Sequence, residues 1–150
     1  MPEIIGIAAE QLHRLRLDTH SDFVAVALPD SDQRIRFHYA DGNDNDRYRH
    51  MIVRSGRGVA GVAILLDRMS RLEKGHPQFE KLRLECPVML AEKLYAAVAI
   101  PVILPLNGRG VLLTGSRSFR TYTDHETELM LMTTEAISEW FRINEITEKK

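Results

Sequence analysis

Residues 123–146 carry the clearest structural signal in the sequence, a capping box that opens a long helix. In Thr123-Asp124-His125-Glu126 the Thr123 hydroxyl accepts the N–H of Glu126, whose carboxylate accepts the N–H of Thr123 in return. Apolar residues then recur at three- and four-residue spacing in two neighbouring stripes: Leu129, Met132, Ala136, Trp140 and Ile143, and beside them Met130, Ile137 and Phe141. Because this apolar arc exceeds half the circumference, we expect the helix to contact its own sheet and a second subunit.

A second amphipathic helix is predicted near the N-terminus, over about residues 3–19. Its apolar residues follow spacings of four, four and three and therefore share one face: Ile4, Ala8, Leu12 and Leu15. A helix at each end of the chain leaves the segments between them to form the sheet.

The first of these segments is a β-hairpin. Residues 23–28 are apolar throughout, which is typical of a strand buried on both sides, and a polar turn follows at residues 29–32. The next strand alternates basic and apolar side chains. This alternation places Ile35, Phe37 and Tyr39 on one face.

A second hairpin is predicted over residues 96–115. Alternate positions of its first strand are apolar and share a face: Val98, Ile100, Val102, Leu104 and Leu106. Pro101 and Pro105 fall on the other register, which predicts an edge strand or a bulge. Asn107-Gly108 is the strongest signal for a two-residue hairpin turn.

The middle of the chain is less regular. Residues 59–66 predict a short helix, and Pro87 opens another over residues 88–93, since proline suits the first turn of a helix. Residues 67–79 read as irregular, and residues 51–53 fit either a helix or a strand. The order of elements predicts one α+β domain over residues 1–150, an antiparallel sheet with the terminal helices on one face.

Composition excludes several classes of function. The 150 residues include a single cysteine, Cys86, so an internal disulfide, a zinc ribbon and an iron–sulfur site are excluded. The formal net charge of −1 gives no global attraction to nucleic acid or to an anionic membrane. No apolar stretch is long enough to span a bilayer, and the early Glu3 argues against a signal peptide, so we expect a cytoplasmic protein.

The motif Gly56-Arg57-Gly58-Val59-Ala60-Gly61 matches G-x-G-x-x-G. A β-hairpin precedes it and another follows, so the dinucleotide-binding interpretation fails for lack of βαβ units. A glycine turn that feeds a helix exposes N–H groups at the positive helix end and can hold a small anion, as can a second helix start at Cys86-Pro87-Val88. The alternative is that the glycines only permit a tight turn and close packing.

Other chemically active side chains give weaker signals. None of the six histidines has metal-ligand spacing, and no cofactor motif is present. Cys86 is either a thiol activated at a helix start or a buried structural residue. A basic cluster consists of Arg47, Arg49, Arg54 and Arg57. It can steer an anion or dock an acidic partner. The alternative is a solvated face whose charge is balanced by Asp41, Asp44 and Asp46.

The sequence resembles a GAF domain over about 100 residues. The resemblance is carried, in order along the chain, by residues 55–61, His76-Pro77-Gln78-Phe79, residues 97–102, Gly110-Val111-Leu112 and residues 122–126. It implies a central antiparallel sheet with dimerising helices on one face and loops that enclose a ligand pocket on the other.

Within the superfamily the chain is most similar to the stand-alone nitrate receptor (NreA-like) family, on the evidence of residues 39–49 and 87–92. The resemblance implies that nitrate or another small anion is held mainly by backbone N–H groups at two helix starts, with Phe37 covering it. The matching positions are Val59, Ala60, Pro87 and Val88. It also implies a sensor histidine kinase as partner, a homodimer through the terminal helices, and no cofactor, metal or catalytic residue. The family has tryptophan in place of Phe37 and tyrosine in place of Cys86, which leaves another small anion or a small apolar molecule open as ligand.

Three functions follow as hypotheses. The first is a small-molecule sensor with no enzymatic activity, which binds neither nucleic acid nor membrane. The second is a methionine sulfoxide reductase, as some GAF domains are, although a lone Cys86 leaves no resolving thiol. The third is a ligand-free dimerisation or docking module.

Overall fold

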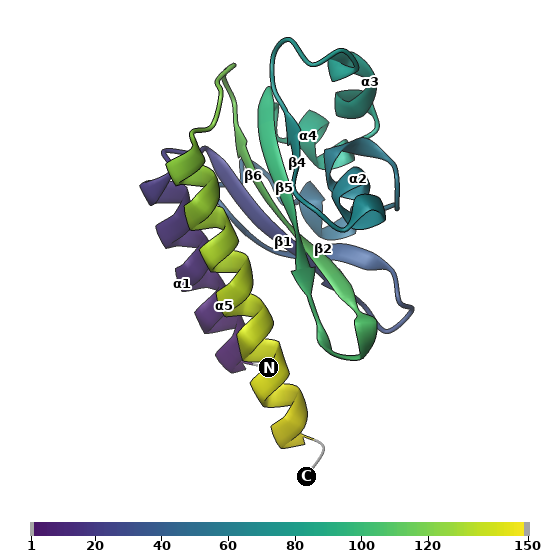
Figure 1. Cartoon of the computed structure of the whole chain (residues 1–150), viewed down its shortest axis with the longest axis vertical. Coiled ribbons are helices and arrows are strands. Elements are labelled where there is room, and N and C mark those ends of the chain that lie inside the picture. The colour runs from purple at the N-terminus through teal and green to yellow at the C-terminus, as the bar shows by residue number, and fades with distance from the viewer. Residues whose placement is uncertain (1, 149–150) are drawn as a thin grey trace.

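The computed structural model describes the backbone of residues 2–148 and the side chains of residues 9–144. Within this range an antiparallel sheet has the strand order β3-β2-β1-β6-β5-β4. Its strands are β1 (Phe23–Pro29), β2 (Ile35–Asp41), β3 (Ile52–Val53), β4 (Ser70–Leu72), β5 (Ala96–Ile103) and β6 (Arg109–Ser116). Helices α1 (Pro2–Asp18) and α5 (Asp124–Glu148) lie side by side on one face, as Figure 1 shows. Short helices cover the other face: α2 (Gly58–Leu66), α3 (Phe79–Leu84) and α4 (Pro87–Ala91). This is the predicted α+β fold.

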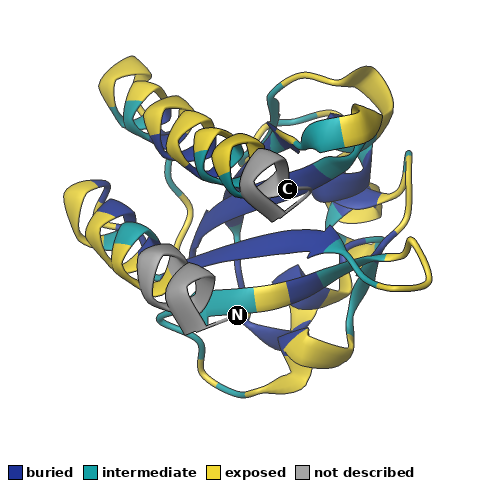
Figure 2. Cartoon of the chain, turned by 90° about the horizontal axis from the view of Figure 1, so that it is seen from below, coloured by how far each residue is buried: buried dark blue, intermediate teal, exposed yellow. Residues whose placement is uncertain are grey.

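The face under α1 and α5 is closed by apolar packing. Leu12 and Leu15 of α1 and Met130 and Ile137 of α5 are buried against the sheet, while Ile4 and Ala8 lie outside the residues whose side chains are described. In the other stripe of α5, Met132, Ala136 and Ile143 turn away from the sheet, and Met132 is 59% exposed. Figure 2 shows the outward faces of both helices as exposed.

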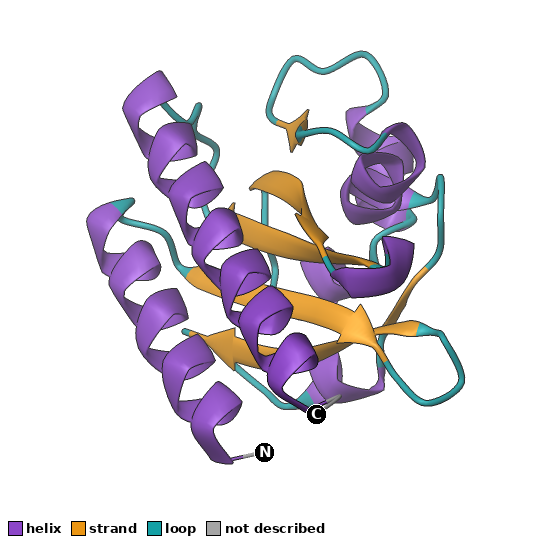
Figure 3. Cartoon of the chain, turned by 60° about the horizontal axis from the view of Figure 1, so that its bottom comes forward, coloured by secondary structure: helices purple, strands orange, loops and turns teal. Residues whose placement is uncertain are grey.

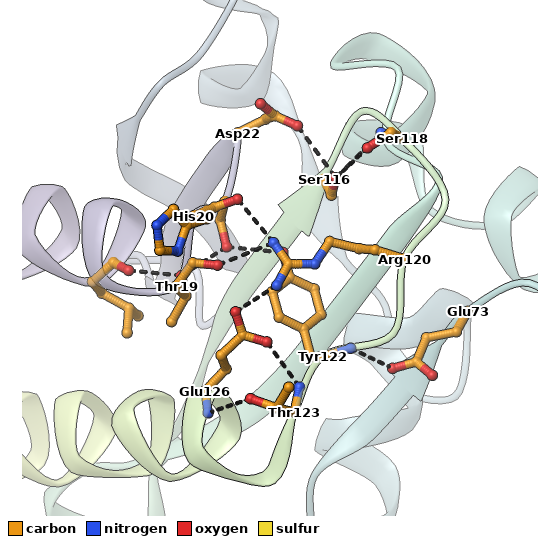
Figure 4. A network of polar contacts seen from close by, with 12 residues as sticks. Thr19, His20, Asp22, Glu73, Ser116, Ser118, Arg120, Tyr122, Thr123 and Glu126 are labelled. Carbon is orange, nitrogen blue, oxygen red and sulfur yellow. Dashed lines mark hydrogen bonds and ion pairs between the residues drawn. The ribbon is translucent and has the colours of Figure 1, made fainter.

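The capping box and a polar network fix the start of α5. Thr123 donates its N–H to Glu126 over 2.8 Å, and Glu126 donates its N–H to the Thr123 hydroxyl over 3.1 Å, as predicted. Arg120 donates to the backbone oxygens of Thr19 and His20 after the end of α1 (Figure 4). The Arg120 guanidinium also pairs with Glu126. The C-terminal end of α1 is thereby tied to the N-terminal end of α5.

A β-bulge in β2 changes which side chains point to each face of the sheet, compared with the prediction. Val26 pairs with Tyr39 and Ala27 with Phe37, so His38 is an extra residue in the ladder. Phe37 therefore packs on the side of the short helices, and Tyr39 packs on the side of α1 and α5. The prediction that both share one face is wrong because a bulge shifts the two-residue alternation by one position.

The second hairpin differs from its prediction at the turn. Pairing ends at Ile103 and Arg109, and a five-residue loop replaces the expected two-residue turn. Its 3₁₀ turn (Pro105–Asn107) holds Leu106 and Asn107 at φ of 59° and 63°. Pro105 cannot donate a ladder hydrogen bond, so the strand stops before Leu106, which is 81% exposed and not in the core.

The irregular segment of the prediction contains β4, a strand that sequence reasoning missed (Figure 3). It pairs with Ala97–Ala99 of β5, so this part of β5 is internal to the sheet. From Ile100 onward β5 is an edge strand, as Pro101 predicted, and the pairing with β6 continues through Pro101 without a bulge. Helix α3 was also missed, and residues 52–53 form β3. No helix in residues 2–148 is both long and apolar enough to cross a membrane.

Candidate functional site

A cavity of about 240 Å³ lies on the short-helix face of the sheet. Its walls come from β2, β3 and the ends of α2, α3 and α4. The lining residues are Phe37, Met51, Ile52, Val53, Arg54, Arg57, Ala60, Leu84, Glu85, Cys86, Pro87 and Val88. Phe37, Val53 and Val88 are buried, whereas Arg54, Arg57 and Leu84 are exposed. The cavity therefore has a buried floor and an exposed rim.

The glycine motif brings two helix starts together at this cavity. Gly58 adopts φ of +72°, and a Cβ on it would lie 2.9 Å from the Cβ of Cys86. A Cβ on Gly61 would lie 2.1 Å from the backbone oxygen of Arg54. Only glycine allows both approaches, and the starts of α2 and α4 consequently meet.

Cys86 occupies the point where these helix starts converge. Its side chain is buried, and its Cβ lies next to Gly58 at the start of α2. Burial raises the pKa of the Cys86 thiol to about 11, and the nearby backbone N–H groups of Ala60, Val88 and Met89 only partly oppose this effect. The thiol is protonated at neutral pH, so the structure favours the buried structural residue over the activated nucleophile.

The structure brings together most of the residues predicted for the site. Phe37, Ala60, Pro87 and Val88 all line the cavity. Val59 does not line it, because its side chain is fully buried in the core of the same face. Pro87 has no N–H and contributes only its ring. The N–H positions that border the cavity are therefore those of Ala60 and Val88.

Two rim arginines were not predicted as site residues, although both belong to the basic cluster noted in the sequence. The Arg57 guanidinium lies 3.7 Å from a Glu85 carboxylate oxygen. Arg54 makes no ion pair with any side chain in residues 9–144. The charged groups of the lining, two arginines and one glutamate, therefore leave one net positive charge at the rim.

The predicted balance of the basic cluster by Asp41 is wrong. The carboxylate of Asp41 instead pairs with the guanidinium of Arg16 at 2.5 Å and with the ring of His13 at 3.1 Å. Arg49 stacks over the Tyr48 ring at 5.5 Å and does not line the cavity. Among the side chains of residues 9–144 no group of histidine, cysteine and carboxylate residues has the geometry of a metal site.

Comparison with solved structures identifies the family. No family model and no curated protein matches the chain. An NreA protein from Staphylococcus aureus, mutated in its nitrate binding site, is 31% identical with a TM-score of 0.65, over 78% of this chain and 88% of that one. A hypothetical protein from S. aureus is 30% identical with a TM-score of 0.67, over 78% of this chain and 98% of that one. This chain is a GAF domain of the NreA family.

The fold of this GAF domain extends beyond the family. The GAF domain of a phosphoenolpyruvate-protein phosphotransferase from Coxiella burnetii has a TM-score of 0.77 over 98% of this chain and 87% of that one. The two sequences are only 13% identical, so the likeness concerns the fold alone. The NreA-type GAF domain thus keeps the sheet and both helical layers of distant GAF domains.

Proposed function

We propose that this GAF domain is a sensor that binds a small monoanion, nitrate first among them, and modulates a sensor histidine kinase of a two-component system. The observation that carries the proposal is a cavity of about 240 Å³ at the meeting point of two helix starts, with two arginines at its rim. This volume lies below the roughly 300–1,000 Å³ of pockets for drug-sized ligands. A ligand of few atoms is the appropriate size.

The electrostatics of the cavity favour an anion. The start of α2 directs the positive end of a helix dipole at the cavity, and Ala60 of its first turn lines the wall. Arg54 and Arg57 add positive charge at the entrance. Phe37 forms part of the buried floor and covers the ligand from the sheet. In the S. aureus NreA structure a nitrate binding site was mutated, which makes nitrate the first anion to test.

A sensor without enzymatic activity fits the chemistry of the cavity better than a thiol enzyme does. Cys86 is the only cysteine of the chain, and burial raises the pKa of its thiol. A thiol that stays protonated is a weak nucleophile. The lining provides no paired carboxylates and no cofactor-binding group, so binding is its proposed role.

The outward face of α1 and α5 supports a homodimer as part of the proposal. A groove of about 320 Å³ runs between the two helices, with Leu15 and Leu129 in its lining. Met132 lines the same groove and is largely exposed. A second copy placed here would bury the apolar stripe that the sheet leaves uncovered. Ligand binding would then reach the kinase through helices shared by two subunits.

The test is a calorimetric titration of the purified protein with nitrate, with nitrite and chloride as controls. Saturable nitrate binding is the expected result. Ala60→Val should weaken it by about tenfold or more, because the added methyl groups enter the cavity. Ala63→Val is the matched control, since Ala63 is a buried alanine of the same helix that does not line the cavity. Absence of heat and of thermal stabilisation at millimolar nitrate would remove nitrate as the ligand.

A further inference from the structure

We infer that the anion best matched to this cavity is a short-chain monocarboxylate, bound with its carboxylate at the arginine rim and its alkyl chain on the buried floor. The inference rests on the proposed function, because it assumes that the cavity binds an anion. It adds the chemical class of the ligand and its orientation.

The volume of the cavity exceeds what an inorganic monoanion fills. About 240 Å³ corresponds to roughly eight water molecules at ~30 Å³ each in the liquid. Nitrate has four non-hydrogen atoms and would leave about half of this space to water. A carboxylate of four or five carbons has six or seven non-hydrogen atoms and would nearly fill it.

The floor of the cavity is apolar and holds water poorly. Phe37, Val53 and Val88 are buried side chains that offer no hydrogen bond, and Met51 and Leu84 extend the apolar wall toward the rim. An ordered water needs two to four polar partners, which this floor does not provide. An alkyl chain that replaces such water gains the free energy of apolar burial.

The charged donors of the lining lie at the rim and not at the floor, because Arg54 and Arg57 are exposed. The guanidinium of Arg54 has no ion-pair partner in the described residues, and that of Arg57 lies 3.7 Å from Glu85. A guanidinium binds a carboxylate through two parallel hydrogen bonds, which suits this position.

The net charge of the lining selects for a single negative charge. Arg54 and Arg57 together outweigh Glu85 by one unit. A second carboxylate on the ligand would lie either beside Glu85 or on the apolar floor, and both placements are unfavourable. Monocarboxylates are therefore favoured over dicarboxylates, and alkylammonium ions with the same chain are excluded by charge.

The experiment is a calorimetric titration of the full chain with formate, acetate, propionate, butyrate, pentanoate and octanoate at constant ionic strength. Succinate, butylammonium and nitrate are the comparison ligands. Affinity should rise roughly fourfold for each added methylene between acetate and pentanoate. It should fall for octanoate, because its ten non-hydrogen atoms exceed what the volume of the cavity accommodates. Succinate should bind more weakly than butyrate, and butylammonium should not bind.

Two pairs of substitutions locate the carboxylate. Arg54→Gln combined with Arg57→Gln should weaken butyrate binding by more than about tenfold. Arg47→Gln combined with Arg49→Gln is the matched control, because both arginines are exposed, belong to the same cluster and do not line the cavity. The control should change butyrate affinity less than about twofold. Val53→Ala should reduce the gain in affinity per methylene, because Val53 belongs to the buried floor on which the alkyl chain is placed.

The outcomes separate this inference from the proposed function. If nitrate binds and carboxylate affinity does not depend on chain length, the inference is wrong and the proposed anion sensor stands. If neither nitrate nor any carboxylate binds, the proposed function fails and the inference fails with it. Equal loss of butyrate affinity in both arginine pairs would overturn the placement of the carboxylate at the rim.

Discussion

One face of the sheet, here called the helix-covered face, is closed by the two long helices α1 and α5. The opposite face, here called the cavity face, is closed by short helices joined through glycine turns. On the first face Met130 and Leu12 fill the space between sheet and helices. On the second face the helix starts meet around Cys86 and leave a cavity beside it. The comparison indicates that long helices close a sheet face by packing along one stripe, whereas short helices joined through glycine turns leave room for a cavity.

The largest expected effect tests the stability of the helix-covered face. Met130→Ala should lower the free energy of unfolding by about 3 kcal/mol, because it removes a fully buried side chain. Met132→Ala on the same helix should cost less than about 0.5 kcal/mol in the monomer, since Met132 is 59% exposed. Urea denaturation measures both. Equal losses would mean that the outward stripe of α5 is also packed in solution.

On the cavity face the equivalent test concerns a glycine. Gly58→Ala should lower the free energy of unfolding by about 2 kcal/mol, because the left-handed backbone and the contact with Cys86 both oppose a side chain. Gly75→Ala is the control: its φ is also positive, at +97°, but no atom lies within 4 Å of the added carbon. It should cost only about 1 kcal/mol. Chemical denaturation of both variants separates backbone strain from steric contact.

A smaller effect is expected at the capping box. Thr123→Ala should lower the free energy of unfolding by about 1 kcal/mol, since the N–H of Glu126 loses its acceptor. Thr121→Ala, two residues earlier and exposed, serves as the control and should leave stability unchanged. Thermal unfolding of the two variants provides the readout. A loss in the control as large as that in Thr123→Ala would show that the hydroxyl bond is not the cause.

The last comparison distinguishes the two faces by the pH dependence of stability, and at neutral pH neither Cys86 nor Tyr122 contributes to that dependence. Burial raises the pKa of Cys86 from 9.0 to about 11, and that of Tyr122 from 10.0 to about 12. Each group keeps its proton to higher pH in the folded state than in the unfolded state, so stability is lost as pH rises. The Cys86 contribution is lost between about pH 9 and 11, and the Tyr122 contribution between about 10 and 12.

Two variants test these pH ranges. Cys86→Ala should flatten the decline of stability at the start of the alkaline range, and Tyr122→Phe should flatten it about one unit higher. Denaturant titrations at a series of pH values measure the slopes. A Cys86→Ala slope identical to that of the parent chain would show that this thiol does not titrate with unfolding.

The sequence predicts the helix-covered face better than the cavity face for a physical reason. The capping box and the spacing of Met130 and Ile137 are local patterns, and the structure confirms both. The bulge at His38 and the strand β4 depend on partners elsewhere in the chain, so periodicity alone missed them. Local signals are sufficient where one long element packs by a single stripe.

The predictions for the candidate site also differ in how far they depend on contacts with distant parts of the chain. Phe37, Ala60 and Val88 were placed at the site through the resemblance to a family, and they do line one cavity. The side chain of Val59 is not part of the lining, because adjacent residues of a helix point in different directions. The rim position of Arg54 follows from the contact between its backbone and Gly61, a tertiary approach that spacing does not reveal.

The short length of β4 has a consequence for the behaviour of the protein at high concentration. Beyond Ala99 the outer edge of β5 has no neighbouring strand within the described residues. An open edge of this kind is the usual starting point for strand addition between molecules and for aggregation. Pro101 lies on this stretch and has no N–H to donate to an incoming strand. The proline that interrupts the edge thus protects the folded domain against edge-to-edge polymerisation.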